Sequence, residues 1–372
     1  MQVGFLIAGN DAHHVAHMLP VAVALARTKP QWAVHILTTG KAAADQVDRC
    51  SQGKGAHPTH LRLIANRRGR ASAVDPRAVL LETDVLPWLD GLVVSRPEAA
   101  SSRTGPSARK TIYLCPGAND RAQMKADCAA FDHMLVAGEK SRFRLASEGR
   151  IDSDRISVVG CPLFDTPGLP EGSAPAADGR KIVLYSPHHS PDMSSWHRWG
   201  RNILDWFVEH DDHRLIFAPH PRLFEHRLVR AKDRLLPIHV RGLEQRYLQA
   251  PNIHVDLDGS ASKARAYGDM ADLYLGDFGG LLYEFIVRPR PCAFLNAHRI
   301  GTDMIDPRFS DWKAGHVIDD PGLFRSQLHI AEEWHADVYR SVQQEMFAHG
   351  ISTTDIPAAL RAASAIATVI SG

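Results

Sequence analysis

Short apolar runs alternate with longer segments of helical periodicity along the first half of the chain. Gln2–Ala8 is typical of a buried strand, Val15–Arg27 has the spacing of a helix, and Trp32–Thr38 is a second strand. Further strands are predicted at Leu61–Ala65, Gly91–Val94, Thr111–Cys115, Phe131–Gly138 and Ile156–Gly160. Such a succession of strand, helix and strand predicts a parallel sheet, whose binding crevice lies at the carboxyl ends of the strands.

The alternation stops at Cys161 and resumes after residue 180. Residues 161–180 contain four prolines and three glycines without periodicity, which is typical of a linker. Beyond it, strands are predicted at Lys181–Ser186, Arg214–Pro221, Asn252–Asp256, Ala271–Leu275 and Pro291–Leu295, and helices at Trp196–His210 and Leu223–Leu235. We therefore expect an α/β protein with domains at 1–160 and 181–350, followed by a helix of small residues within 351–372.

In the stretch Ala271–Phe285 a predicted strand meets a tight turn and then a helix. Gly279 and Gly280 remove side chains where the turn meets the helix, so a phosphate can approach the free N–H groups and the positive end of the helix dipole. Glu284, about one turn further on, is placed to accept a hydrogen bond from a ribose or glycerol hydroxyl. Asp277 is expected to cap the helix or to orient a histidine. The alternative is an ordinary connection of an α/β sheet.

The composition is that of an ordinary globular protein with two domains, since 44% of the 372 residues are hydrophobic and 23% are charged. A formal net charge of +1 gives no argument for nucleic acid as the partner. The five cysteines are odd in number and form no Cys-x-x-Cys pair, so we expect neither a disulfide framework nor a zinc finger. We therefore expect a cytoplasmic location. Because no window reaches the roughly 18 apolar residues of a spanning helix, any membrane contact would be peripheral, at the inner face.

Several of the 21 histidines are clustered near the start of the chain. His13, His14 and His17 fall at or just after the first loop, where we expect one of them to serve in acid–base chemistry or acceptor binding, with plain packing as the alternative. His13 and His17 are four residues apart and would share a helical face. No His-Glu-x-x-His arrangement supplies a further ligand, so we expect no metal.

Two more histidines follow predicted strands of the second half. His220 stands between Pro219 and Pro221, which fix the backbone on both sides and remove N–H groups. His188 lies in the loop after Lys181–Ser186. Because parallel strands end at one edge of a sheet, His188, His220 and the Gly-Gly turn are expected to converge there.

Two polar pairs precede the Gly-Gly turn in the chain. Ser260 and Ser262 open a predicted helix as hydroxyl caps, close to the expected nucleotide. Asp256 and Asp258 have the spacing of an Asp-x-Asp metal pair, but the glycine and serine that follow favour a turn.

The second half resembles the CDP-glycerol glycerophosphotransferase family, which builds glycerol-phosphate polymers such as teichoic acids on a GT-B scaffold. The resemblance rests on Ile182–Pro187, Ala218–Pro221 and Ala271–Gly280, which are similar to the family's Tyr-x-Pro strand, His-Pro motif and Asp-Tyr-Ser-Ser turn, and it covers residues 110–300. It implies two Rossmann-like domains with parallel sheets facing across a cleft. The C-terminal domain would hold the nucleotide donor and the N-terminal domain the acceptor, and the last helix would pack back on the N-terminal domain.

The sequence departs from the family's pattern at two places. The hydroxyl pair of the family's turn is replaced by Gly279 and Gly280, which leaves only backbone amides as phosphate donors. The family's His-Gly-Thr motif, which is thought to supply the base, appears as Pro116-Gly117-Ala118. A different base would have to come from His13, His14, His17 or His188.

We therefore expect a transferase that moves a glycerol-phosphate or glycosyl group from a nucleotide diphosphate donor such as CDP-glycerol to a hydroxyl of a glycan, lipid-linked or polymer acceptor in cell-envelope synthesis, without a cofactor. The expected catalytic residues are His13, His14, His17 and His220. The expected nucleotide- and phosphate-binding residues are His188, His220, Ser260, Ser262, Asp277, Gly279, Gly280 and Glu284. GT-B glycosyltransferases and UDP-GlcNAc 2-epimerases share the scaffold, and a nucleotide-binding protein without catalysis is a further alternative.

Overall fold

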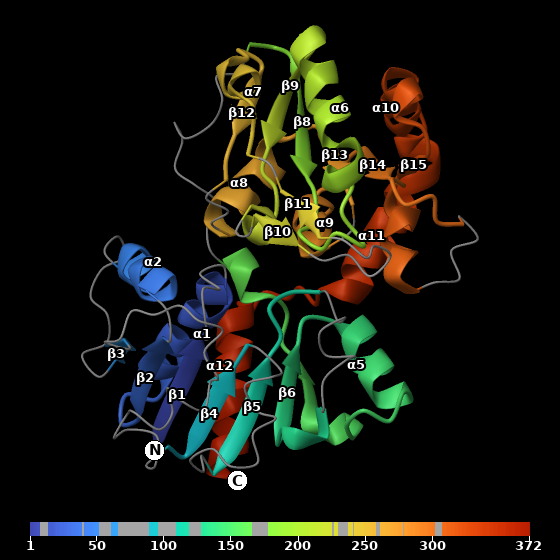
Figure 1. Cartoon of the computed structure of the whole chain (residues 1–372). Helices are drawn as coiled ribbons and strands as arrows, with labels where there is room; N and C mark the ends of the chain where they lie inside the picture. Colours follow the sequence, from blue (N-terminus) through green and yellow to red (C-terminus); the bar gives the residue numbers. More distant parts are fainter. Residues whose placement is uncertain are drawn as a thin grey trace. The chain divides into compact units, whose positions relative to one another are not determined.

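The computed structural model describes residues 1–7, 14–38, 41–51, 61–65, 89–95, 109–118, 128–165, 178–224, 227–229, 237–240, 242–257, 261–277, 279–301 and 307–372. The chain divides into two compact units, shown in Figure 1. Unit 1 consists of Met1–Pro167 together with Ala348–Gly372, and unit 2 consists of Gly168–Phe347.

Unit 1 is built on a parallel sheet of seven strands in the order β3-β2-β1-β4-β5-β6-β7. Its strands are β1 (Gln2–Ile7), β2 (Ala33–Thr38), β3 (Leu61–Ala65), β4 (Gly91–Val94), β5 (Lys110–Leu114), β6 (His133–Val136) and β7 (Ile156–Val158). Its α-helices are α1 (Val15–Thr28), α2 (Lys41–Ser51), α5 (Glu139–Ser147) and α12 (Ala358–Ser371), and its short 3-10 turns are η4 (Cys128–Ala130), η5 (Ser153–Arg155) and η6 (Pro162–Asp165).

Both faces of the sheet in unit 1 are covered. Phe5 and Ile7 of β1 pack into the layer that contains α1 and α12, whereas Leu6 packs into the opposite layer with Leu145 of α5. A strand that is buried on both faces needs apolar residues at successive positions, which explains the continuous apolar run of β1.

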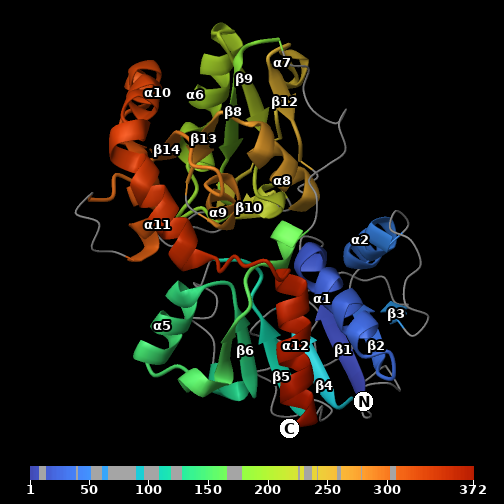
Figure 2. The ribbon, with the colours of Figure 1, turned by 180° about the vertical axis from the view of Figure 1, so that it is seen from behind.

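The C-terminal helix α12 packs beside α1 on one face of this sheet (Figure 2). Its small residues permit a close approach, and a side chain at Gly91 of β4 would collide with Ile370. Asp165 caps the helix, since its two carboxylate oxygens accept hydrogen bonds from the N–H groups of Ala358 (2.9 Å) and Ala359 (2.6 Å). The C-terminal segment therefore completes the core of unit 1.

Unit 2 is built on a parallel sheet of six strands in the order β12-β9-β8-β13-β14-β15. Its strands are β8 (Lys181–Ser186), β9 (His213–Phe217), β12 (Ile253–Val255), β13 (Leu273–Gly276), β14 (Cys292–Leu295) and β15 (His316–Ile318). Its helices are α6 (Trp196–Glu209), α7 (Gln245–Gln249), α8 (Ala261–Met270), α9 (Gly280–Phe285), α10 (Phe324–Glu333) and α11 (Arg340–Gly350), whose last residues belong to unit 1. Between α10 and α11 the chain makes a π-helical turn at His335–Tyr339, and the 3-10 turns are η7 (Pro221–Leu223), η8 (Pro307–Ala314) and η9 (Pro321–Leu323).

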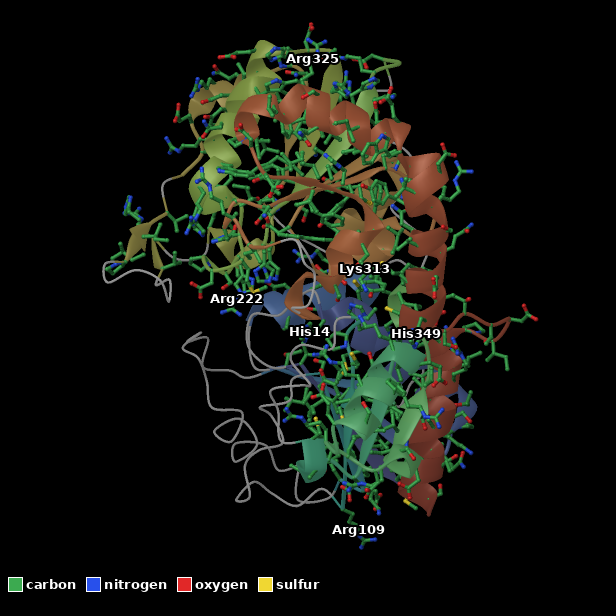
Figure 3. All side chains as sticks on the ribbon, turned by 90° about the vertical axis from the view of Figure 1, so that its right-hand side faces the viewer. His14, Arg109, Arg222, Lys313, Arg325 and His349 are labelled. Carbon is green, nitrogen blue, oxygen red and sulfur yellow. The ribbon has the colours of Figure 1, made fainter. Side chains whose placement is uncertain are left out.

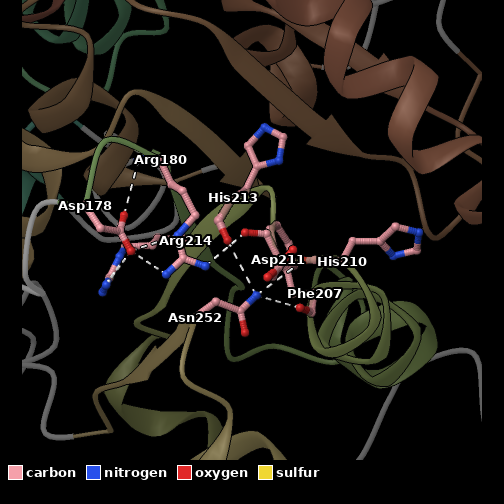
Figure 4. A network of polar contacts seen from close by, with 8 residues as sticks. All are labelled: Asp178, Arg180, Phe207, His210, Asp211, His213, Arg214 and Asn252. Atoms are coloured by element: carbon pink, nitrogen blue, oxygen red, sulfur yellow. Dashed lines mark hydrogen bonds and ion pairs between the residues drawn. The ribbon is translucent and has the colours of Figure 1, made fainter.

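A polar network holds the amino-terminal edge of this sheet (Figure 4). The carboxylate of Asp178 accepts hydrogen bonds from Arg180 and, at 2.7 Å, from Arg214 of β9. These two guanidinium groups hold the pKa of Asp178 well below its usual range. The Asn252 amide donates to the carbonyl groups of Phe207, His210 and His213. These contacts fasten the start of unit 2 to the start of its sheet.

The helix predicted over Leu223–Leu235 is wrong for the residues that the structure describes. There, β10 (Leu228–Val229) pairs antiparallel with β11 (Ile238–His239). The apolar spacing in this segment suits a helix. The strand partners lie 11 residues further on for Leu228 and 9 residues further on for Val229, and the spacing does not reveal them. Within the described part of the chain, no helix combines the length and the apolar character that a membrane crossing requires.

Candidate functional site

The strand order of unit 2 reverses at β8. The chain passes from β8 to β9 and β12 on one side of the sheet, and then returns to place β13 on the other side of β8. The last residues of β8 and β13, Ser186 and Gly276, are register partners. In open α/β sheets, ligands bind outside the carboxyl ends of the strands at such a reversal.

Three imidazole rings gather at this edge. His188 and His189 follow β8, and His220 follows β9. The ring centroids of His188 and His189 are 4.4 Å apart, and those of His189 and His220 are 4.3 Å apart. The rings of His188 and His220, which the sequence predicts to converge, lie 5.8 Å apart with the ring of His189 next to both.

Backbone amides orient two of these rings in the same way. The N–H of Ser190 donates to Nδ1 of His188 (3.0 Å), and the N–H of Arg222 donates to Nδ1 of His220 (3.2 Å). An Nδ1 atom that accepts a hydrogen bond carries no proton, so the neutral ring is protonated at Nε2. In this tautomer Nε2–H is the donor group of each ring, and a phosphate oxygen is a suitable acceptor for such a group.

The loop that carries His220 is joined directly to the loop after β8. The N–H of His220 donates to the carbonyl of Pro187 (3.0 Å). Pro219 and Pro221 restrict the backbone on either side. Arg222, an exposed cation on the same loop, is labelled in Figure 3.

Asp277 follows β13 and is almost completely buried, with 2% of its surface exposed. One carboxylate oxygen accepts the N–H of His188 (2.7 Å), and the other accepts the N–H of Ser195 (2.9 Å). Burial raises the pKa of Asp277 from 3.8 to about 7, against the opposing effect of these hydrogen bonds. Asp277 thus holds the loop that carries His188 and His189.

The turn between β13 and α9 depends on a glycine. Gly279 has φ +159° and ψ −176°, a backbone region in which residues with a Cβ atom are strained. A Cβ atom at this position would meet nothing within 4 Å, so the turn borders open space. Gly280 begins α9, and Glu284 lies half-buried on that helix.

The remaining predicted residues of unit 2 have other positions. Ser260 lies outside the described residues, as does Asp258, and Ser262 belongs to the first turn of α8. Asp256 accepts a hydrogen bond from the hydroxyl of Tyr267 (2.6 Å). In the described parts of the chain, no group of three or more His, Cys, Asp or Glu side chains could hold a metal ion.

Unit 1 has the same reversal at β1, since β2 and β3 lie on one side of β1 and β4 lies on the other. His14 (Figure 3) precedes α1, and its Nδ1 lies 2.9 Å from the hydroxyl of Ser95, which follows β4 and is 2% exposed. His17 is 6% exposed, and its Nδ1 lies 3.7 Å from the sulfur of Cys161. Of the three histidines predicted here, His14 lies at the reversal, His17 is packed in the core and His13 lies outside the described residues.

Ser95, His189 and His298 were not predicted from the sequence. Ser95 follows β4, next to the reversal of unit 1, and His189 follows β8 and is adjacent to the predicted His188, so these positions could have identified both. Nε2 of His298 lies 3.1 Å from the carbonyl of Ser194, in the loop after β8. Pro116-Gly117-Ala118 follows β5 and places no imidazole at that strand end.

Comparison with solved structures shows proteins of the same fold. The wall teichoic acid polymerase TagF matches with a TM-score of 0.61 and 11% identity, over 99% of this chain and 89% of that chain. The UDP-GlcNAc 2-epimerase from Neisseria meningitidis, bound to UDP-GlcNAc, matches with a TM-score of 0.60 and 15% identity over the full length of both chains. S. aureus MnaA in complex with UDP has a TM-score of 0.62 and 14% identity, over 98% of this chain and 95% of that chain.

The chain has the GT-B fold. The predicted α/β architecture with two Rossmann-like sheets is confirmed, and so is the resemblance to the teichoic acid polymerases, at the level of the fold. Comparison with protein families and with curated proteins finds no match. Since the likeness is one of fold, the activity has to be argued from the residues at the two reversals.

The raised pKa of Asp277 predicts a pH dependence of stability. The pKa of Asp277 is about 7 in the folded protein, against an ordinary value of 3.8. Between these two pH values folding is therefore accompanied by the uptake of a proton at Asp277. The contribution of Asp277 to the free energy of unfolding consequently falls as the pH rises. Asp277→Asn cannot titrate. The free energy of unfolding of the native protein, measured by urea denaturation relative to this variant, should therefore decrease between about pH 4 and pH 7. A difference that stays constant over this range would contradict the assignment.

Proposed function

We propose that this protein is a transferase that takes a glycerol-phosphate or glycosyl group from a nucleotide diphosphate donor and transfers it to an acceptor hydroxyl. The observation that carries the proposal is the cluster of His188, His189 and His220 beside the Gly279 turn, at the strand reversal of unit 2. Oriented N–H donors next to open space form a site that suits an anionic diphosphate.

The comparisons support a nucleotide donor for a protein of this fold. The N. meningitidis epimerase is described with UDP-GlcNAc and MnaA with UDP. TagF is a wall teichoic acid polymerase, and this likeness favours a polymer acceptor of the cell envelope. The proposed donor is similar to CDP-glycerol, and the proposed acceptor is a polymer, glycan or lipid-linked hydroxyl. The resemblance at the His-Pro segment favours this donor.

In the proposed reaction, the acceptor hydroxyl attacks the phosphorus or the anomeric carbon of the donor. Negative charge develops on the leaving nucleotide phosphate, where the Nε2–H groups of His188 and His220 stabilise it. Loss of one such oriented donor typically costs about 10² to 10³ in rate. His14 is the proposed general base, because it lies at the reversal of unit 1 and Ser95 orients its ring.

A sugar-nucleotide epimerase is the second candidate. Its support is the full-length match to the N. meningitidis enzyme, with a TM-score close to that of TagF. Incubation with CDP-glycerol or UDP-GlcNAc in the absence of acceptor, followed by nucleotide chromatography, separates the candidates. Slow release of nucleotide favours the transferase, a changed sugar favours the epimerase, and binding without turnover favours a binding protein.

We propose that the reaction takes place in the cytoplasm. None of the five cysteines forms a disulfide, which fits a reducing compartment. A lipid-linked acceptor would bring the protein to the inner face of the membrane as a peripheral partner.

His220→Ala should weaken nucleotide binding more than it weakens the fold. It removes one oriented donor at the carboxyl edge, so we expect the affinity for CDP and UDP to fall roughly tenfold or more. Isothermal titration calorimetry and thermal melting on the same samples measure both effects. His213→Ala, at the amino-terminal edge of the same sheet, is the matched control and should leave affinity unchanged. Equal affinities for His220→Ala and the parent protein would remove His220 from the site.

His14→Ala should lower turnover and leave nucleotide binding intact. A positioned base contributes about 10² to 10⁴ in rate, so donor consumption should slow by a comparable factor. His17→Ala, three residues further on in α1, is the comparison. It should reduce stability without a selective effect on turnover, because His17 is packed against Cys161. Full turnover by folded His14→Ala would place the base elsewhere, with His188 as the next candidate.

A further inference from the structure

One carboxylate holds both ends of the loop that follows β8. Residues 187–195 connect β8 to α6. Near the start of this loop the N–H of His188 donates to Asp277 (2.7 Å), and at its end the N–H of Ser195 donates to the other oxygen of Asp277 (2.9 Å). The Ser195 hydroxyl also lies 2.9 Å from the hydroxyl of the buried Tyr185. The carboxylate of Asp277 thereby accepts hydrogen bonds from two backbone N–H groups that have no partner in a helix or sheet, because they lie in an irregular segment.

The direction of the His188 ring depends on the shape of this loop. Nδ1 of His188 accepts the N–H of Ser190, and the carbonyl of Ser190 in turn accepts the N–H of Ser194 (2.9 Å). The carbonyl of Pro187, at the start of the same loop, accepts the N–H of His220. A change in the backbone at residues 187–195 would therefore redirect His188 and remove a contact that holds His220.

Asp277 is poorly placed to bind a ligand itself. It is 2% exposed, and each of its oxygens already accepts a backbone N–H. We propose that Asp277 is a positioning residue, which clamps the loop 187–195 so that the Nε2–H groups of His188 and His220 face a phosphate of the nucleotide. This inference rests on the proposed function for its ligand, whereas the clamp itself is a property of the free protein.

The chain provides a matched control at the other end of the same strand. Asp272 precedes β13, and its carboxylate accepts the N–H of Ile182 at the start of β8 (2.8 Å). Asp272 and Asp277 lie at the amino and carboxyl ends of β13, and both accept backbone N–H groups, Asp272 from β8 itself and Asp277 from the loop that follows β8. Only Asp277 holds the histidine loop.

The test compares Asp277→Asn, Asp277→Ala and Asp272→Asn with the parent protein. Amide hydrogen exchange of residues 188–195 reports the loop without any ligand, and calorimetry with CDP and UDP reports nucleotide affinity. Asp277→Asn keeps one acceptor oxygen. It should show faster amide exchange in this loop and a roughly tenfold loss of nucleotide affinity. Asp277→Ala should have a larger effect on both quantities. The loss should be the same for CDP and UDP, because the clamp acts on the phosphate end. Asp272→Asn should change neither quantity.

Two outcomes would overturn the inference. Unchanged exchange in folded Asp277→Asn shows that the carboxylate does not hold the loop, even if affinity falls, and would make Asp277 a direct ligand group. Faster exchange with unchanged affinity shows that the loop does not position the phosphate donors. If the parent protein binds neither nucleotide, the proposed function fails, but the exchange data still decide whether Asp277 is a clamp.

Discussion

Two hydrogen bonds to the buried carboxylate of Asp277 are the interaction on which the candidate site depends. A carboxylate is costly to remove from water unless hydrogen bonds satisfy it, and here burial still raises its pKa to about 7. In return, the loop after β8 has a fixed shape. This loop carries two of the three clustered histidines, and its Pro187 carbonyl accepts the backbone N–H of the third, His220. Burial of a titratable carboxyl group is an unfavourable term of a kind that is common at functional sites.

The two units reach similar geometry with different chemistry. In each, the strand order reverses at the first strand, β1 or β8, and polar side chains from the loops on either side meet at the carboxyl edge. In unit 1 the pair is His14 with Ser95, whereas in unit 2 it is the histidine loop with Asp277. A histidine and hydroxyl pair suits proton transfer, and a set of N–H donors suits an anion, which is the division of roles that the proposed transferase requires.

Local pattern was sufficient for part of this site. The prolines around His220 and the apolar strand before it correctly predict a histidine at a strand end, and the strand before Gly279 is likewise correct. The bonds of Asp277 could not be predicted, since its partners Ser195 and His188 are 82 and 89 residues away in the chain. The same holds for Ser95, which meets His14 across 81 residues. Periodicity also misled at Leu228–Val229, where a hairpin partner replaced the predicted helix. Sequence pattern thus places residues at strand ends, but only the order of the strands determines which of them meet.

The central claim is that a nucleotide diphosphate binds at the carboxyl edge of the sheet in unit 2. The most direct test is a titration of the protein with UDP or CDP in which NMR spectra monitor the ring resonances of the histidines. His188, His189 and His220 should shift together and saturably, while His210 and His213, at the amino-terminal edge of the same sheet, should stay unchanged. Saturable shifts of other histidines with the three site rings unperturbed would contradict the account.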